Sequence, residues 1–180
     1  DYDSEFRLQG KPIPPLYSID TSDKVIYINT FSKSLASTIR ISYMVLPKQL
    51  LTRYNEELSF YSCTVSNFEQ YTLAKFIEKG YLEKHINRMR NYYRNLRDTM
   101  LSCIKNEPGY PYTTILEEDA GLHFLLKLNT KLSDEELILK AASQGIHISC
   151  LNQYYAVLPP KDSHTIIINY SGIHTTDITE

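Results

Sequence analysis

The stretch VIYINTFSKSL at residues 25–35, followed by IRISYMVLP at residues 39–47, decides the fold. Each stretch contains a run rich in β-branched residues, Val25–Asn29 and Ile39–Leu46, and each run predicts a strand. The segment between them, 30–37, is built from small and polar residues. It is too short and too polar for a helix, so we expect a loop there. The sequence therefore predicts a strand, a small-residue loop and a second strand.

Helical patterns follow these strands along the chain. The segments 48–59 and 66–79 are predicted to be helices, and Gly80 is placed to end the second of them. The segment 81–105 carries an apolar residue at every third or fourth position, which predicts one long amphipathic helix. By contrast, 8–23 is rich in proline and polar residues, and we expect an irregular surface loop.

The pattern changes again in the last third of the chain. Four strand-like runs and one helix follow in the order strand, strand, helix, strand, strand, which predicts a small α+β lobe. The helix is predicted to begin with a capping box at Ser133 and to end at Gln144. We therefore divide the chain into a first domain, 1–80, and a second, 81–180, which starts with the long helix. The strands are predicted at 112–116, 122–128, 146–150 and 165–170.

Composition excludes several classes of protein. The chain has 180 residues, and its net charge of −2 provides no overall field for nucleic acid. It contains no run of about 18 apolar residues, so we expect no membrane span. The cysteines and histidines lack metal-ligand spacing, so no metal site is predicted. The odd number of widely spaced cysteines suggests a reducing, cytoplasmic setting. Both ends of the chain look cut, and we expect it to be a piece of something longer.

The best candidate for chemistry is Lys33, which lies in the predicted loop with Thr30 and Ser32 before it and Arg40 a few residues later. A catalytic amine that forms a Schiff base must be partly desolvated and held on a rigid element. Small hydroxyl side chains can bond a phosphate without blocking the amine, and an arginine can clamp the phosphate with two hydrogen bonds. The alternative is a solvated loop lysine beside a surface arginine, because Ser-Lys-Ser is a common sequence.

The wider pattern extends over nearly the whole chain. It begins with DYDSEF (1–6) and KPIPPLYSID (11–20), includes the two strand stretches, and continues through EEDAGLHFLLKL (117–128), SQGIHISCLNQYY (143–155) and TIIINYSGI (165–173). In order and spacing these segments resemble the pyridoxal-phosphate domain of fold type I aminotransferases. The closest match is the aminotransferase-like domain of the MocR branch of GntR-type transcriptional regulators. The resemblance implies an α/β fold, the C-terminal part of the large pyridoxal-phosphate domain followed by a small α+β lobe.

The resemblance also implies roles for individual residues. Lys33 matches the lysine that bonds the cofactor's aldehyde, and Tyr2 matches the tyrosine that contacts the cofactor's phenolic oxygen. Arg40 matches the phosphate-binding arginine, and Thr30 and Ser32 match hydroxyl positions on the same phosphate loop. The alternatives are a packed aromatic for Tyr2 and turn capping for Thr30 and Ser32.

Two departures from the family pattern matter. In the family, the carboxylate that pairs with the cofactor's ring nitrogen lies two residues before the position of Tyr2. Asp1 is the neighbour of that position and not its equivalent. The family's glycine-containing phosphate loop and stacking aromatic lie further upstream. In addition, no arginine follows Arg97 to clamp a substrate carboxylate, which favours a sensor over an efficient transaminase. Gln153 is a weak candidate for neutral substrate contacts, and His123 is more readily explained as a buried, satisfied histidine.

Three hypotheses follow from the resemblance. The first is the effector-sensing half of a MocR-type regulator that binds pyridoxal phosphate at Lys33. Its effector would be an amino acid or the cofactor itself, it would form a homodimer, and it would read DNA through a separate N-terminal winged-helix domain. The second is a stand-alone aminotransferase that acts on an amino acid. The third is a fragment without activity of its own, which we prefer for the isolated 180 residues because they lack most cofactor contacts.

Overall fold

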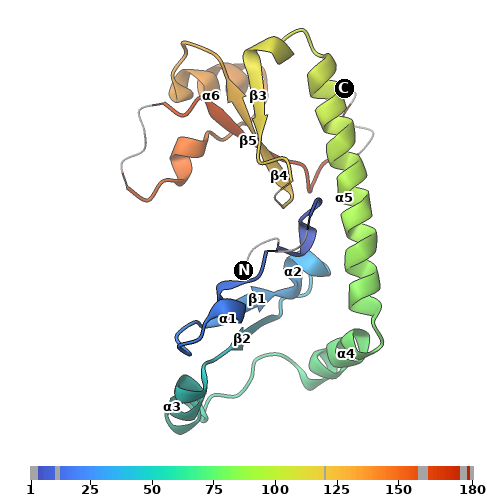
Figure 1. The fold of residues 1–180 in the computed structure, drawn as a ribbon, viewed down its shortest axis with the longest axis vertical. Helices are drawn as coiled ribbons and strands as arrows, with labels where there is room; N and C mark the ends of the chain where they lie inside the picture. Colours follow the sequence, from blue (N-terminus) through green and yellow to red (C-terminus); the bar gives the residue numbers. More distant parts are fainter. Residues whose placement is uncertain (1–3, 11–12, 120, 158–161, 175–177, 179–180) are drawn as a thin grey trace. The chain divides into compact units, whose positions relative to one another are not determined.

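The structure is a computed structural model that describes residues 4–10, 13–119, 121–157, 162–174 and 178. The chain forms two compact units, Asp1–Arg90 and Asn91–Glu180, called the first and the second unit below (Figure 1). Among the described residues, no helix has the length and apolar character needed to cross a membrane. The predicted assignment of 1–80 and 81–180 to two functional domains stays a prediction.

The first unit contains a two-stranded antiparallel sheet with a single helical turn between its strands. Strand β1 (Tyr27–Thr30) pairs with β2 (Ser42–Val45), and Thr30 lies opposite Ser42. The prediction of a plain loop after β1 was wrong, because α2 (Phe31–Ser34) forms there. The turn closes through a hydrogen bond from the Leu35 backbone N–H to the Phe31 carbonyl, at 2.9 Å. Polarity argued against a long helix but not against one turn, which needs few apolar contacts.

Two longer helices of the first unit form where the sequence predicts them. Helix α3 (Lys48–Leu58) follows β2, and α4 (Asn67–Glu78) begins after Ser66. The Ser66 hydroxyl caps α4 by accepting the backbone N–H of Glu69 at 3.2 Å. Gly80, which ends this helical segment, has a φ of +69°, a conformation that favours glycine.

The N-terminal segment holds two further short helices, η1 (Ser4–Phe6) and α1 (Leu16–Ile19). The second lies within a stretch predicted to be irregular, so that prediction was wrong for one turn. The long helix α5 (Tyr81–Asn106) confirms the amphipathic helix predicted at 81–105, and the division between the two units falls within it.

The second unit is built on a three-stranded antiparallel sheet in the order β3-β4-β5. Its strands are β3 (Thr113–Leu116), β4 (His123–Leu128) and β5 (Thr165–Asn169). Helix α6 (Asp134–Ser143) lies between β4 and β5 in the chain, and the predicted capping box is present. The Ser133 hydroxyl accepts from the backbone N–H of Glu136, and the Glu136 carboxylate accepts from the backbone N–H of Ser133. The described part of the unit also contains the short 3₁₀ helices η2 (Tyr110–Tyr112) and η3 (Leu151–Tyr154).

The predicted strand at 146–150 was wrong. Only the end of this segment reaches the sheet, through an isolated bridge between Cys150 and Ile166 and a hydrogen bond from the Ile167 N–H to the Ser149 carbonyl at 3.0 Å. Ile146 is exposed, so its β-branched side chain has no apolar surface to cover. Local propensity without such a surface does not make a strand.

The second unit has a closed apolar core. Phe124 on β4 stacks on Tyr170 with ring centroids 6.2 Å apart, and the Tyr170 hydroxyl donates to the Gly121 carbonyl at 2.9 Å. Both aromatic side chains are fully buried, and the phenol oxygen is satisfied by this hydrogen bond. The other buried apolar side chains here are Leu96, Leu101, Leu122, Cys150 and Ile166.

Candidate cofactor-binding site

Lys33 lies on the single turn of α2, directly after strand β1. The side chain of Lys33 is exposed, whereas the next residue, Ser34, is buried and anchors the turn. A turn fixed at the end of a paired strand holds its lysine more rigidly than an open loop does. The described residues do not supply the desolvation that makes an amine nucleophilic, because they leave Lys33 exposed.

Arg40 and Ser32 come together next to this turn. The Ser32 hydroxyl donates to the carbonyl of Ile39 at 2.8 Å, and Arg40 donates from Nη1 to the same hydroxyl oxygen at 3.4 Å. The Ser32 hydroxyl therefore closes the turn and also lies within reach of the guanidinium. Both the turn-closing role and the phosphate-loop role predicted for Ser32 are compatible with this position.

Thr30 ends β1 and stands at the start of α2. Its hydroxyl does not cap the turn, and its side chain is exposed. Its backbone N–H donates to the side-chain oxygen of Asn29 at 2.7 Å. The capping alternative for Thr30 is therefore not what the structure shows, and its predicted phosphate contact stays a prediction.

The end of β1 and the turn of α2, residues 29–34, are called the β1–α2 corner below. The donor groups at this corner fit the phosphate end and the aldehyde end of pyridoxal phosphate. A guanidinium and a hydroxyl lie in contact, and they match the oxygen acceptors of a phosphate. The amine of Lys33 follows one residue after Ser32. The described residues of this corner include no carboxylate assigned to the cofactor's ring nitrogen.

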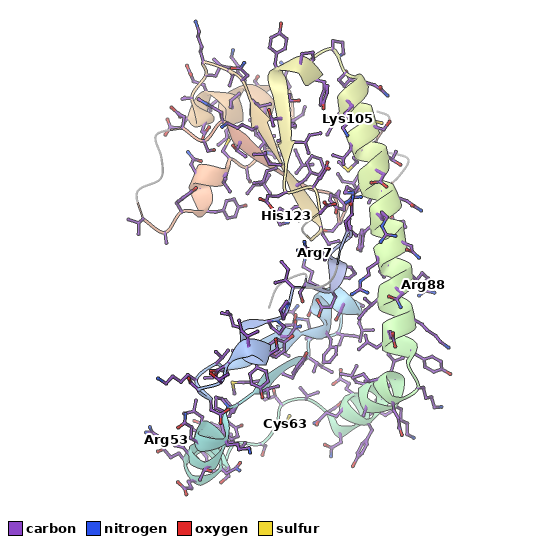
Figure 2. All side chains as sticks on the ribbon, in the orientation of Figure 1. Arg7, Arg53, Cys63, Arg88, Lys105 and His123 are labelled. Carbon is purple, nitrogen blue, oxygen red and sulfur yellow. The ribbon has the colours of Figure 1, made fainter. Side chains whose placement is uncertain are left out.

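The other predicted site residues are Tyr2, His123 and Gln153. Tyr2 lies outside the described residues. His123 is half-buried on β4 opposite Asn169 (Figure 2). Gln153 is exposed on η3. Both belong to the second unit, and their contacts with a substrate or effector stay predictions.

The structure adds a polar network that the sequence analysis did not single out. Asn29, at the end of β1, has an exposed fraction of 8%, and its amide nitrogen donates to the Glu5 carboxylate and to the Tyr27 hydroxyl, each at 3.0 Å. Burial raises the pKa of Tyr27. The one sequence signal for this network is that Asn29 is a polar residue directly after the apolar run Val25–Ile28 and shortly before Lys33.

A second polar cluster, in the second unit, gathers around Asp134. Its carboxylate accepts hydrogen bonds from the backbone N–H and hydroxyl of Ser163, both at 2.9 Å, and from the backbone N–H of His164 at 2.8 Å. Burial alone would raise the pKa of Asp134, but these hydrogen bonds outweigh it and leave the pKa below its usual value. Asp162 and His164 offer ligand atoms within 4.8 Å of Asp134. The hydrogen bonds already account for the buried carboxylate without a metal.

Comparisons with known proteins agree with the fold and with the resemblance. The family model for aminotransferase class I and II matches residues 5–179. The chain is 42% identical over its whole length to the uncharacterized HTH-type transcriptional regulator YdeL of Bacillus subtilis, of which it covers 38%. It is 33% identical, again over its whole length, to the probable rhizopine catabolism regulatory protein MocR of Rhizobium meliloti, of which it covers 36%.

A solved structure supports the same conclusion. The kynurenine aminotransferase of Pyrococcus horikoshii superposes with a TM-score of 0.76 at 26% identity, over 97% of this chain and 43% of that chain. The chain thus spans less than half the length of the relatives it matches. The predicted aminotransferase fold and the resemblance to MocR-type regulators are confirmed. The chain belongs to the class I and II aminotransferase family.

Proposed function

We propose that this chain is the pyridoxal-phosphate-binding, effector-sensing part of a MocR-type transcriptional regulator. The contact between Arg40 and Ser32, one residue before Lys33, carries the cofactor part of the proposal. The identity of 42% to one HTH-type regulator over the whole chain supports the regulator part. An aromatic-amino-acid aminotransferase of Thermococcus litoralis is only 27% identical.

The chain's own residues have separate tasks at such a site. Arg40 and Ser32 bind the phosphate, with Thr30 beside them, and Lys33 holds the aldehyde end through its amine. When bound, pyridoxal phosphate supplies an aldehyde that condenses with amines and a ring that accepts electrons. The effector is an amino acid or the cofactor itself, and it can shift the protein only by binding one conformation more tightly than another.

The second unit supports a sensor over an efficient transaminase. Arg97 is the last arginine of the chain, and its side chain has an exposed fraction of only 4%. It pairs with Asp98 and Asp119, each at 2.8 Å. A guanidinium occupied by two carboxylates is not free to clamp a substrate carboxylate. We therefore expect neutral groups of the second unit to contribute to effector recognition, with Gln153 as a candidate.

The longer protein proposed here has partners that the chain itself does not contain. It forms a homodimer and binds DNA through an N-terminal winged-helix domain, and it works in the cytoplasm. Two relatives that match over the whole chain or nearly so are named as HTH-type regulators, which supports this part of the proposal.

Borohydride trapping tests the cofactor part. The full-length protein and the 180-residue chain are each mixed with pyridoxal phosphate, reduced and mapped by mass spectrometry. We expect stoichiometric label on Lys33 in the full-length protein, loss of that label in Lys33→Ala, and little change in the control Lys24→Ala. The isolated chain should label weakly. Absence of label on Lys33 in the full-length protein would refute the proposal.

A second experiment separates the regulator from the alternative, a stand-alone aminotransferase. The full-length protein is tested for binding to its own upstream DNA and for amino-group transfer from a panel of amino acids. Cofactor-dependent DNA binding with negligible turnover supports the regulator. Rapid turnover without DNA binding would support the aminotransferase.

A further inference from the structure

The side chain of Asn29, four residues before Lys33, makes three hydrogen bonds. Its amide nitrogen uses both hydrogens, one on the Glu5 carboxylate and one on the Tyr27 hydroxyl. Its oxygen accepts the backbone N–H of Thr30 at 2.7 Å. One buried amide therefore fixes the backbone where β1 becomes α2 and ties it to a residue far away in the sequence.

Glu5 is held from a second side as well. The Arg90 guanidinium donates from Nε to the carbonyl oxygen of Glu5, and it donates from Nη1 to the side-chain oxygen of Asn87 at 3.1 Å. Phe6, the next residue, is completely buried. The backbone at Glu5 and Phe6 is thus held in place independently of Asn29. The Glu5 carboxylate can therefore act as a fixed hydrogen-bond partner for the corner.

The polarity of this pair is specific. The amide of Asn29 donates and the carboxylate of Glu5 accepts, and a buried group left without its partner costs much more than a typical hydrogen bond contributes. An aspartate at position 29 would keep the oxygen that accepts from Thr30, but it would set a carboxylate against the carboxylate of Glu5.

We propose that Asn29 and Glu5 are positioning residues that hold the β1–α2 corner in the geometry required for cofactor binding at Lys33, a claim that rests on the proposed function. The corner carries Thr30, Ser32 and Lys33 within four residues. A tilt of its first peptide group displaces all three side chains together. Neither Asn29 nor Glu5 needs to touch the cofactor for this role.

The polarity of the pair can be inverted, which gives a direct test in the full-length protein. Asn29→Asp breaks the pair, and Glu5→Gln alone keeps an acceptor. The double variant Asn29→Asp/Glu5→Gln restores the pair in reverse, because the new amide donates to the new carboxylate. Asn95→Asp changes the same charge at an exposed position of α5 and serves as the control.

Three quantities are measured for each variant: the dissociation constant of pyridoxal phosphate, the absorption maximum of the bound cofactor, and the rate of borohydride labelling at Lys33. We expect Asn29→Asp to weaken binding at least about tenfold, to slow labelling and to shift the absorption maximum. The double variant should recover most of all three, and Asn95→Asp should behave as the unmodified protein. Thermal melting without cofactor monitors the folded fraction.

The outcomes separate this inference from the proposed function. If Lys33 takes no label in the unmodified protein, the proposed function fails first. If Lys33 labels normally and Asn29→Asp leaves all three quantities unchanged, the positioning role is wrong. It is also wrong if melting shifts but the absorption maximum and the labelling rate of the folded protein do not, because the pair then serves stability alone.

Discussion

The two units differ in how much of their own apolar surface they bury. In the second unit, Phe124 and Tyr170 lie in a closed core. In the first unit, β1 and β2 pair only with each other among the described residues, and three of their apolar side chains, Ile28, Tyr43 and Met44, are exposed. An isolated two-stranded sheet is marginally stable in water. The difference indicates that the second unit buries enough apolar surface to be stable by itself, whereas the first unit needs further apolar contacts.

The exposed side chains of the first unit extend well beyond the sheet. Apolar exposure on this scale marks surfaces that other chain segments or other molecules cover. We therefore expect the isolated chain to associate, and the Lys33 corner to reach its binding geometry only when this surface is covered. The large exposed side chains in question include Ile28, Tyr43, Met44, Leu51, Phe60, Tyr61, Phe68 and Tyr71.

The largest expected contrast is between two core deletions. Phe124→Ala removes a fully buried ring and should reduce the free energy of unfolding by about 3–5 kcal/mol. Ile28→Ala, at a side chain that is 52% exposed, should cost about 1 kcal/mol or less. Urea denaturation followed by circular dichroism measures both. Equal losses would contradict the difference between the units.

Thiol labelling compares the units without changing the core. Cys63 is exposed between α3 and α4 of the first unit (Figure 2), whereas Cys150 is buried in the second. Burial, together with the charge of Asp134, raises the pKa of Cys150. We expect a thiol reagent to modify Cys63 at least about a hundredfold faster. Single-cysteine variants provide the rates, and similar rates would mean that the core of the second unit opens readily.

Acid should weaken the second unit through Asp134. Its pKa in the folded protein lies below the usual value near 3.9, so its contribution to stability is present above about pH 4 and is lost as the pH falls through the lower, folded-state pKa. Asp134→Asn should cost about 1–3 kcal/mol at neutral pH and should remove this part of the acid dependence. Urea denaturation at several pH values measures both effects. Glu135→Gln, at an exposed neighbour, is the control.

The smallest contrast concerns two helix caps. Ser133→Ala removes a complete capping box from α6 and should cost about 1 kcal/mol. Ser66→Ala removes the cap of α4, none of whose residues is buried, and should cost about half as much because fraying there loosens no core. Hydrogen exchange of the first-turn amides measures each loss. A larger loss at Ser66 would show that α4 is more firmly packed than its exposure indicates.

The sequence was informative wherever a local signal determined the structure. The spacing of apolar residues predicted α5 to within a residue of each end, and Ser133 with Glu136 predicted the start of α6. The strand at 146–150 was wrong because its formation depended on a partner surface that only Cys150 and Ser149 reach. Strand propensity states what a segment prefers, not what lies beside it.

The sequence predicted the chemical groups of the candidate site but not the hydrogen bonds that hold its backbone in place. The types and spacing of Lys33, Ser32 and Arg40 indicated an amine beside a phosphate clamp, and the structure brings Ser32 and Arg40 into contact. The pairing of Asn29 with Glu5 joins residues far apart in sequence. No periodicity or local motif encodes such a contact, so only the folded chain reveals it.

The hydrogen bonds around Asp134 also offer a handle for protein engineering. They join the start of α6 to the residues just before β5. The two ends of the segment from Asp134 to Ser163 are therefore held together by hydrogen bonds. Lengthening a closed loop costs free energy only as the logarithm of its length. A fluorescent tag inserted next to Val157, which is 80% exposed, should therefore leave both attachment points intact.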